Sequence, residues 1–449
     1  MQSQIIEKKH LSAKGMLQKV KKIFNKIPSK ARDPRGLKST ISLSDCLMSG
    51  LAIFSMKYSS LLQFDQEQNE ETVRYNLEKL YDVKNAPCDT TLRERLDDVD
   101  PQHLRETFTS VFSALQRGKV LESYKFLNKY ILFAVDGTGL FSSDKVHCEN
   151  CCEKHHRNGK ITYYHQMLAG VAIHPDNKEV FPLCPEPISK PDGSTKNDCE
   201  QNATKRFLQS FKKEHPHLKG VFTMDALSSR GPCIQEIKNI GAHYIIGVKP
   251  GGNKSLFEWI KGIELENHEV KTKKEFLQFR FINNIPLNDV NSDINVNFLE
   301  CCIIRKNKTK TYFTWITDIE ITKENIHELS RGGRARWSIE NETFNTLKNQ
   351  GYNFEHNFGH GYKNLTHVFS FLIFLAFLID QVQQRCCKLF QSSLQKMISK
   401  KRLWRKMRSI FTEFYVDSWE ALFNYIFNKQ KIELMIINKM KIKIMFNST

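Results

Sequence analysis

The spacing of apolar residues divides the chain into regions of different type. From about Thr40 to Leu127, apolar residues recur at three- and four-residue intervals, as in LSDCLMSGLAIFSM. This spacing is the period of an amphipathic helix. In APCDTTLRERLDDV, Asp89 or Thr90 is placed to cap the helix that follows. The pattern predicts an all-helical N-terminal module, residues 1–127.

A different pattern begins at YILFAV, residues 130–135. This short apolar run ends in Asp136 and is typical of a buried strand. Further strands are predicted at 163–173, 179–183, 220–224 and 244–248, with helices at 202–213 and 229–240. Three strands, then a helix, a strand, a helix and a strand match the order of a ribonuclease-H-like core. We therefore predict an α/β fold with a ribonuclease-H-like mixed sheet and flanking helices, and residues 128–250 as its first part.

The next region is polar and rich in strand-forming residues. Stretches such as FLQFRFINN and KTYFTWITDI lie in residues 251–318, where no helix signal of comparable strength occurs. This composition predicts a β-rich insertion. A helix is expected to begin near Glu324, and another to carry Arg334 to Gln350 and to end at Gly351. Residues 319–364 would then be the last part of the core.

The C-terminal region, residues 365–449, returns to helical, apolar and basic sequence. Its most apolar run, residues 368–379, is shorter than the roughly 20 residues that span a bilayer, so we expect a buried helix and no membrane span. The N-terminal segment MQSQIIEKKHLSAKGMLQKV has no apolar stretch of signal-peptide length. Secretion is therefore not expected, and a cytoplasmic protein is.

The charge balance favours a polyanionic partner. The chain has 67 Lys and Arg against 49 Asp and Glu, a formal net charge of +18. Such an excess is typical of proteins that bind nucleic acid. A Lys- and Asn-rich composition also arises in AT-rich genomes, so charge alone does not decide between these explanations.

Acidic residues occupy three positions that suit metal-dependent cleavage of a phosphodiester. Asp136 follows the first predicted strand, Asp225 follows the fourth, and Glu340 lies on the late helix. Two-metal catalysis needs carboxylates that converge on a pair of divalent ions. One acid at a strand end often only caps the next helix, but three in this order indicate a site for two Mg²⁺ or Mn²⁺ ions.

The late helix places charged residues on one face. Arg336, Glu340 and Lys348 follow at multiples of four residues, so they lie near one another on a regular helix. Arg336 and Lys348 could hold DNA phosphates beside the acid, while Trp337 and Leu347 would pack inward. The alternative is a solvated helix with an ordinary Arg–Glu pair.

Five strings together resemble the DDE transposases of bacterial insertion sequences. They are AVDGTG, HRNGKITYYHQMLAG, FTMDALSSR, YIIGVKP and RWSIENETFNTLKNQGYNFEHNFGHG. The resemblance covers roughly residues 40–380. It implies a ribonuclease-H-like catalytic domain, magnesium-dependent cleavage of element ends and transfer into target DNA, with terminal repeats and target DNA as partners and a homodimer on the paired ends. By position, Asp136, Asp225 and Glu340 match the catalytic triad.

Two departures from the group with the Tyr-Arg-Glu-Lys signature concern the late helix. Gly333 stands where that group has Tyr, and Lys348 follows Glu340 by eight positions instead of seven. Glu342 is therefore a rival third ligand. Glu340 is preferred because Arg336 precedes it by the expected four residues.

Soft metal ligands crowd into one short segment. The candidate zinc ligands are Cys148, Cys151, Cys152 and His155, among which Cys148 and Cys151 have the Cys-x-x-Cys spacing of a zinc knuckle. A second ligand pair is not obvious, although His165 or a cysteine from elsewhere could complete the shell. The alternative is a group of reduced packing cysteines.

Several further polar residues are open to two interpretations. Asp198 and Glu200 could join the metal site or cap the next helix, and capping is favoured. Arg230 and Lys249, with Lys254, could contact DNA phosphates, or could form a solvated basic loop.

The Gly-rich segment after the late helix holds Asn357, His360 and His367. A structural turn is the simplest interpretation, although His360 could contact DNA or the edge of the site.

The acids do not by themselves establish joining activity. The same residues would serve a metal-dependent nuclease that cuts without joining, and a DNA-binding protein derived from a transposon would not need them.

Overall fold

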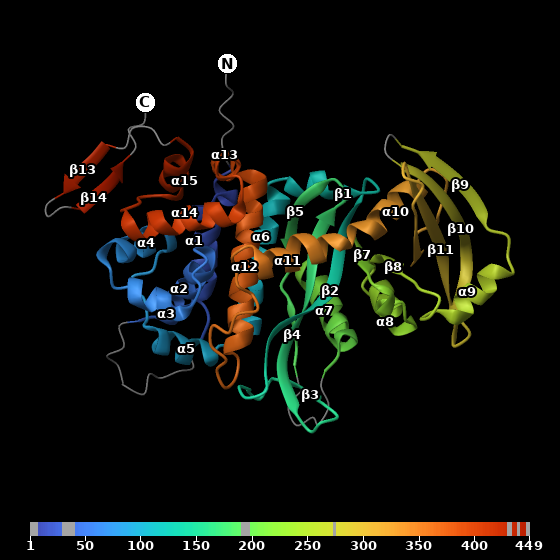
Figure 1. Cartoon of the computed structure of the whole chain (residues 1–449), viewed down its shortest axis with the longest axis horizontal. Helices are drawn as coiled ribbons and strands as arrows, with labels where there is room; N and C mark the ends of the chain where they lie inside the picture. Colours follow the sequence, from blue (N-terminus) through green and yellow to red (C-terminus); the bar gives the residue numbers. More distant parts are fainter. Residues whose placement is uncertain are drawn as a thin grey trace, which may run out of the picture.

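A mixed sheet forms the centre of the molecule (Figure 1). The computed structural model describes residues 8–28, 41–189, 198–272, 275–428, 433–437 and 441–445. Strand β2 (Tyr130–Ser143) pairs antiparallel with β4 (Ile161–His174) and parallel with β7 (Gly220–Met224), which pairs parallel with β8 (His243–Gly247). Strand β5 (Asn177–Pro182) pairs with β4. The order β5-β4-β2-β7-β8 confirms the predicted ribonuclease-H-like arrangement.

Two amphipathic helices form the crossovers between the parallel strands. Helix α7 (Glu200–Glu214) precedes β7, and α8 (Gly231–Asn239) joins β7 to β8. Helix α7 packs on β4, where a Cβ on Gly170 would lie 2.1 Å from the ring of Phe207. Only a glycine permits this close approach of helix and strand.

The β-rich insertion continues the same sheet. Its strands are β9 (Glu266–Lys271), β10 (Glu275–Asn288), β11 (Asn291–Arg305) and β12 (Lys310–Thr317), paired antiparallel in this order. Strand β12 pairs with β8, so all these strands belong to one 12-stranded sheet. The insertion also contains a helix, α9 (Lys254–Lys261). The expectation of no helix here was wrong, because eight residues are too few to show a clear period.

The late helix is not regular. Helix α10 (Ile326–Ala335) is the helix expected to begin near Glu324, and the late helix after it consists of a π-helical segment η5 (Ile339–Phe344) and α11 (Asn345–Asn349). Gly351 follows with φ of +101°, in keeping with the expected terminating glycine. The prediction of one continuous helix with four-residue stepping was wrong in the π-helical segment. Such segments occur most often at functional sites.

Helices from the two ends of the chain pack together beside the sheet. Helix α12 (Leu365–Cys386) contacts α2, α5, α6 and β5 and therefore joins the N-terminal helices to the core (Figure 1). Among the described residues, α12 is long and apolar enough to cross a bilayer, but 94% of its apolar window is buried inside the protein. The apolar run in this region thus forms a core helix, as predicted.

The other elements complete these layers. The N-terminal helices are α1 (Ala13–Phe24), α2 (Leu43–Ser55), α3 (Leu61–Glu67), α4 (Glu71–Tyr81), α5 (Asp89–Asp97) and α6 (Arg105–Arg117). The C-terminal elements are α13 (Lys388–Met397), α14 (Lys400–Glu413), α15 (Trp419–Asn428), β13 (Glu433–Ile437) and β14 (Lys441–Met445). Short strands β1 (Lys125–Phe126), β3 (Cys152–His155) and β6 (Glu186–Ile188) line the edges of the core sheet.

Candidate active site

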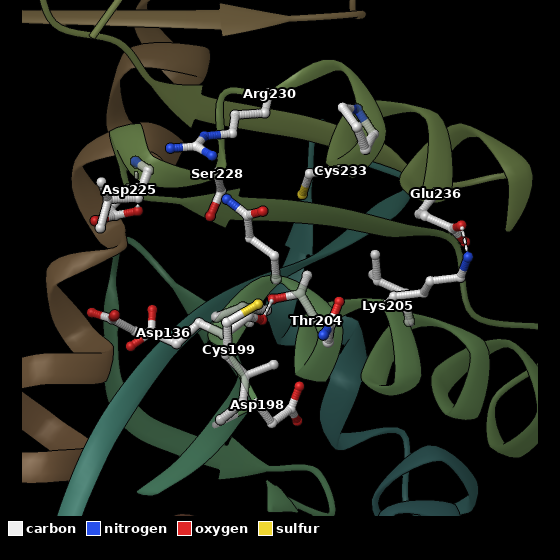
Figure 2. A pocket seen from close by; sticks show the side chains of 18 of the residues that line it. Asp136, Asp198, Cys199, Thr204, Lys205, Asp225, Ser228, Arg230, Cys233 and Glu236 are labelled. Carbon is white, nitrogen blue, oxygen red and sulfur yellow. Dashed lines mark hydrogen bonds and ion pairs between the residues drawn. The ribbon is translucent and has the colours of Figure 1, made fainter. Parts of the chain in front are cut away.

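Two of the three predicted acids lie side by side, just beyond the point where two neighbouring parallel strands stop pairing with each other. Ala134 of β2 pairs with Thr223 of β7, and each strand reaches its acid two residues later. Parallel strands are about 4.8 Å apart, so the register places Asp136 next to Asp225. Both side chains open into a cavity of about 710 Å³, and Figure 2 shows them on the same side of it.

The third acid comes from the π-helical segment, which packs against β2 and β5. Arg336 Nη2 donates to Glu340 Oε1 at 2.7 Å, and its Nη1 donates to Asp136 Oδ2 at 2.9 Å. One guanidinium therefore contacts both carboxylates. The structure thus brings together Asp136, Asp225 and Glu340, although they come from three distant parts of the sequence.

The environment of Asp136 favours a bound cation. Burial raises the pKa of the Asp136 carboxyl to about 6; Arg336 and the backbone N–H of Gly137 oppose this effect, while the nearby Asp225 and Glu340 carboxylates add to it. Like charges at close range disfavour ionisation unless a cation neutralises them. A divalent ion would supply this neutralisation with the hard oxygen ligands that Mg²⁺ prefers.

A fourth carboxylate stands at the same site. A Cβ on Gly137 would lie 2.3 Å from Glu200 Oε1, so the Glu200 side chain covers the backbone directly after Asp136. Burial raises the pKa of Glu200, and the Asp225 carboxylate adds to this effect. Asp198 instead forms an ion pair with Arg206 at 2.7 Å. Helix capping was the favoured sequence interpretation for both acids, and it overlooked the position of Glu200 beside the triad.

The rival acid Glu342 faces another part of the molecule. Burial lowers the pKa of Lys400, at the start of α14, and the nearby Glu342 carboxylate opposes that effect. Glu340, by contrast, adds to the negative electrostatic environment of Asp136. The geometry therefore favours Glu340 as the third acid.

The remaining residues of the late helix depart from the expected face. Lys348 forms an ion pair with Glu355 at 2.8 Å instead of joining Arg336 and Glu340. Trp337 is 53% exposed, so its expected inward packing was wrong, while Leu347 is buried as expected. The π-helical segment changes the angular spacing between Glu340 and Lys348, which explains why the four-residue rule fails here.

One predicted DNA-binding residue lies at the cavity of the acids, and two other basic residues are exposed. Arg230 is exposed and lines the same cavity as Asp136 and Asp225 (Figure 2). Lys249, directly after β8, and Lys254, at the start of α9, are exposed as well. These positions suit contacts with a phosphate backbone, whose affinity depends on such charges.

The candidate zinc ligands divide into two groups. Cys148 and Cys151 lie with His165 and His360 in one cluster. Cys152 and His155 do not join it: the Cys152 thiol donates to the carbonyl of Ile188 at 3.6 Å, and the exposed His155 contacts Glu153 at 3.2 Å. Cys152 is the first residue of strand β3, and its thiol points to Ile188 and not to the cluster.

His360 was assigned to a turn on sequence grounds, and His367 with it. The ring of His367 on α12 packs against His165 at 5.0 Å between ring centroids. The Cys-x-x-Cys spacing was the sequence signal for the cluster. A zinc site with this spacing needs a second pair of ligands, and this need was the only sequence indication of His360.

Comparisons with known proteins leave the family open. No protein-family model matches the chain, and no curated protein matches it by sequence. A structural comparison finds similarity to a piggyBac transposase in a synaptic complex with hairpin DNA, with a TM-score of 0.39 and 11% identity, covering 95% of this chain and 82% of that one. Similarity at this level does not assign an activity.

Proposed function

We propose that the chain is a DDE-type DNA transposase that cleaves the ends of an insertion sequence and joins them to target DNA. The observation that carries the proposal is the meeting of Asp136, Asp225 and Glu340 at one edge of a ribonuclease-H-like sheet. The sequence resemblance to bacterial insertion-sequence transposases adds the substrate class.

The carboxylates would hold two Mg²⁺ or Mn²⁺ ions. Asp136 lies next to Asp225 by the strand register, and Arg336 links it to Glu340. Asp136 would therefore be the acid that binds both ions. Bound divalent ions would activate the attacking oxygen and stabilise the leaving oxygen of the phosphodiester. Glu200 is positioned to add a further oxygen ligand or to orient a metal-bound ligand.

The chain's own cations would position the DNA. Arg230 lies over the cavity that Asp136 and Asp225 line, and Lys249 is exposed beyond β8. Both would neutralise phosphates, and Arg336 would support the charge that develops at the reacting phosphate. Lys348 would contact DNA only after its ion pair with Glu355 opens.

The proposed reaction has two steps of the same chemistry. A water attacks the phosphodiester at the element end, which releases a 3′ hydroxyl as the leaving group. That hydroxyl then attacks a phosphodiester of the target, and the new bond replaces the broken one. No covalent enzyme intermediate is needed. A homodimer would hold the two ends in the nucleoid; a strictly monomeric complex with both ends would count against this assembly.

Cleavage and joining of end-labelled DNA that carries the flanking ends of the element would test the proposal. Wild-type protein with Mg²⁺ is expected to cut and join, Glu340→Gln to do neither, and Glu342→Gln to retain both reactions. Glu342 is a matched control because it lies on the same segment η5. Loss of activity only in Glu342→Gln would move the third ligand to that residue.

The same assay separates the alternative functions. Cleaved ends without joined product would indicate a metal-dependent nuclease. Binding without either reaction would indicate a transposon-derived DNA-binding protein, and the proposed enzymatic function would then be wrong.

A further inference from the structure

Four soft ligands from three separate segments meet away from the carboxylates. Cys148 and Cys151 lie in the loop between β2 and β3, His165 lies on β4, and His360 precedes α12. One ligand atom from each residue lies within 4.8 Å of the other three. Cys151, His165 and His360 are buried, and Cys148 is half-buried.

The distances among these atoms have the values that a tetrahedral zinc site requires. Zn–S bonds of about 2.3 Å and Zn–N bonds of about 2.0–2.1 Å place two sulfurs about 3.8 Å apart, a sulfur and a nitrogen about 3.5 Å apart, and two nitrogens about 3.3 Å apart. The observed Sγ–Sγ distance is 3.9 Å, three of the four Sγ–Nε2 distances are 3.4, 3.4 and 3.2 Å, and the Nε2–Nε2 distance is 3.4 Å.

Neither a disulfide nor hydrogen bonds to the Nδ1 atoms of the two histidines explain this arrangement. The two sulfurs are too far apart for a disulfide, whose S–S bond is about 2.05 Å long. Among the described residues, Nδ1 of His165 and Nδ1 of His360 have no hydrogen-bond partner. Hydrogen bonds on the far side of the rings therefore do not set their orientation, and both Nε2 atoms point at the sulfurs.

We propose that Cys148, Cys151, His165 and His360 bind one Zn²⁺ ion in a closed structural site. Four protein ligands complete the tetrahedron and leave no position for a substrate, which distinguishes structural from catalytic zinc. Two thiolates and two imidazoles also select zinc over the hard ions expected at the carboxylates. The two metal sites thus differ in ligand chemistry and in the ion they hold.

The site would join two parts of the chain that flank the acids. Cys148 and Cys151 follow β2, the strand that carries Asp136, and His360 follows the helical segments that carry Glu340. A zinc ion would fix the loop after α11 to the loop after β2. The role of this ion is therefore to hold the third acid in register with the first.

A cavity adjoins the cluster at His360. His360 lines a cavity of about 520 Å³ together with Lys145, His147 and Tyr362. Tyr362 is 82% exposed, so this cavity reaches the solvent. The ion can enter from that side after the core has folded.

Metal analysis of the full-length chain would test the site without DNA. Protein produced with zinc in the medium is expected to hold one zinc per chain after gel filtration, and Cys151→Ser to lose it. Cys152→Ser is the matched control, because Cys152 is adjacent and buried but contacts Ile188 instead. Zinc loss from both variants, or retention by both, would overturn the assigned ligands.

Cobalt provides a second measurement that does not depend on folding of a variant. Wild-type protein reconstituted with Co²⁺ is expected to show the intense visible d–d bands of tetrahedral cobalt and a thiolate-to-metal charge-transfer band. Absence of both bands, together with zinc-free wild-type protein, would overturn the proposal. The inference does not rest on the transposase function, since neither measurement involves DNA cleavage.

Discussion

Arg336 joins Asp136 to Glu340 through two hydrogen bonds, at 2.9 and 2.7 Å, from the two ends of one guanidinium. A single positive charge thus contacts two carboxylates of the site. The sequence suggested that Arg336 binds DNA. Its contacts show that it also affects the electrostatics of the acids.

Arg336→Met is expected to shift the pH dependence of Mg²⁺-dependent cleavage. Arg336 lowers the pKa of Asp136, which lies at about 6, and its removal would raise that pKa further. Because only the ionised carboxylate binds metal, the acidic limb of the profile should move to higher pH by about one unit or more. Arg334→Met is the control, since Arg334 contacts Glu275 instead. An unchanged limb in Arg336→Met would contradict the assigned coupling.

Gly137→Ala is expected to impair metal binding by displacing Glu200. The new Cβ would meet Glu200 Oε1 at 2.3 Å, whereas a Cβ on Gly139, on the same strand, meets nothing within 4 Å. Cleavage at limiting Mg²⁺ should fall about tenfold in Gly137→Ala, a loss of about 1.4 kcal/mol. Gly139→Ala should resemble wild type. Equal activity of the two variants across a Mg²⁺ titration would remove Glu200 from the site.

Asp97→Asn is expected to lower the free energy of unfolding by about 2 kcal/mol. The Asp97 carboxylate accepts the backbone N–H groups at the start of α12, from Tyr362, Lys363, Asn364 and Leu365. A neutral amide keeps one acceptor oxygen and loses the favourable charge at a helix N-terminus.

Asp98→Asn is the matched control for this measurement by denaturant titration. Asp98 accepts from the exposed Lys363 ammonium at 2.8 Å, and such an exposed ion pair contributes little to stability. A larger loss in Asp98→Asn than in Asp97→Asn would contradict the proposed capping role.

Lys57→Met is expected to destabilise the protein by about 3–5 kcal/mol. Lys57 Nζ lies 2.7 Å from Asp380 Oδ2 on α12, and Tyr352 donates to the same oxygen at 2.6 Å. Without the ammonium, a buried carboxylate would remain uncompensated. Lys26→Met breaks the exposed pair with Glu106 and should cost under about 1 kcal/mol. Urea unfolding would measure the free energy of unfolding of both variants. Similar losses in the two would contradict the larger contribution predicted for the buried pair.

The core strands and two of the acids could be predicted from the sequence because they depend on local pattern. Residues 130–135 and 220–224 are continuous apolar runs in buried strands, and an acid follows each run; β7 ends at Met224, whereas β2 continues past Asp136 to Ser143. Parallel pairing then brings Asp136 and Asp225 together, since strand order follows from the sequence of elements.

The positions of Lys348, His360 and Glu200 depend on packing between segments that are distant in the sequence. Apolar spacing does not distinguish a π-helical segment from a regular helix, so the displacement of Lys348 toward Glu355 was not predicted. His360 is separated from Cys151 by 209 positions, and nothing local marks it as its partner. Glu200 reaches the site because Gly137 leaves room for it, a contact that only the folded core reveals.

The pairing of Trp315 with Gly247 returns the chain to the sheet edge from which the insertion departed. The distance in space between β8 and α10 therefore does not depend on the length of the inserted segment that connects them. Outer strands such as β9 and β10 can be lengthened, trimmed or exchanged by evolution, and new contacts can be acquired there, while the geometry of the three acids is inherited unchanged.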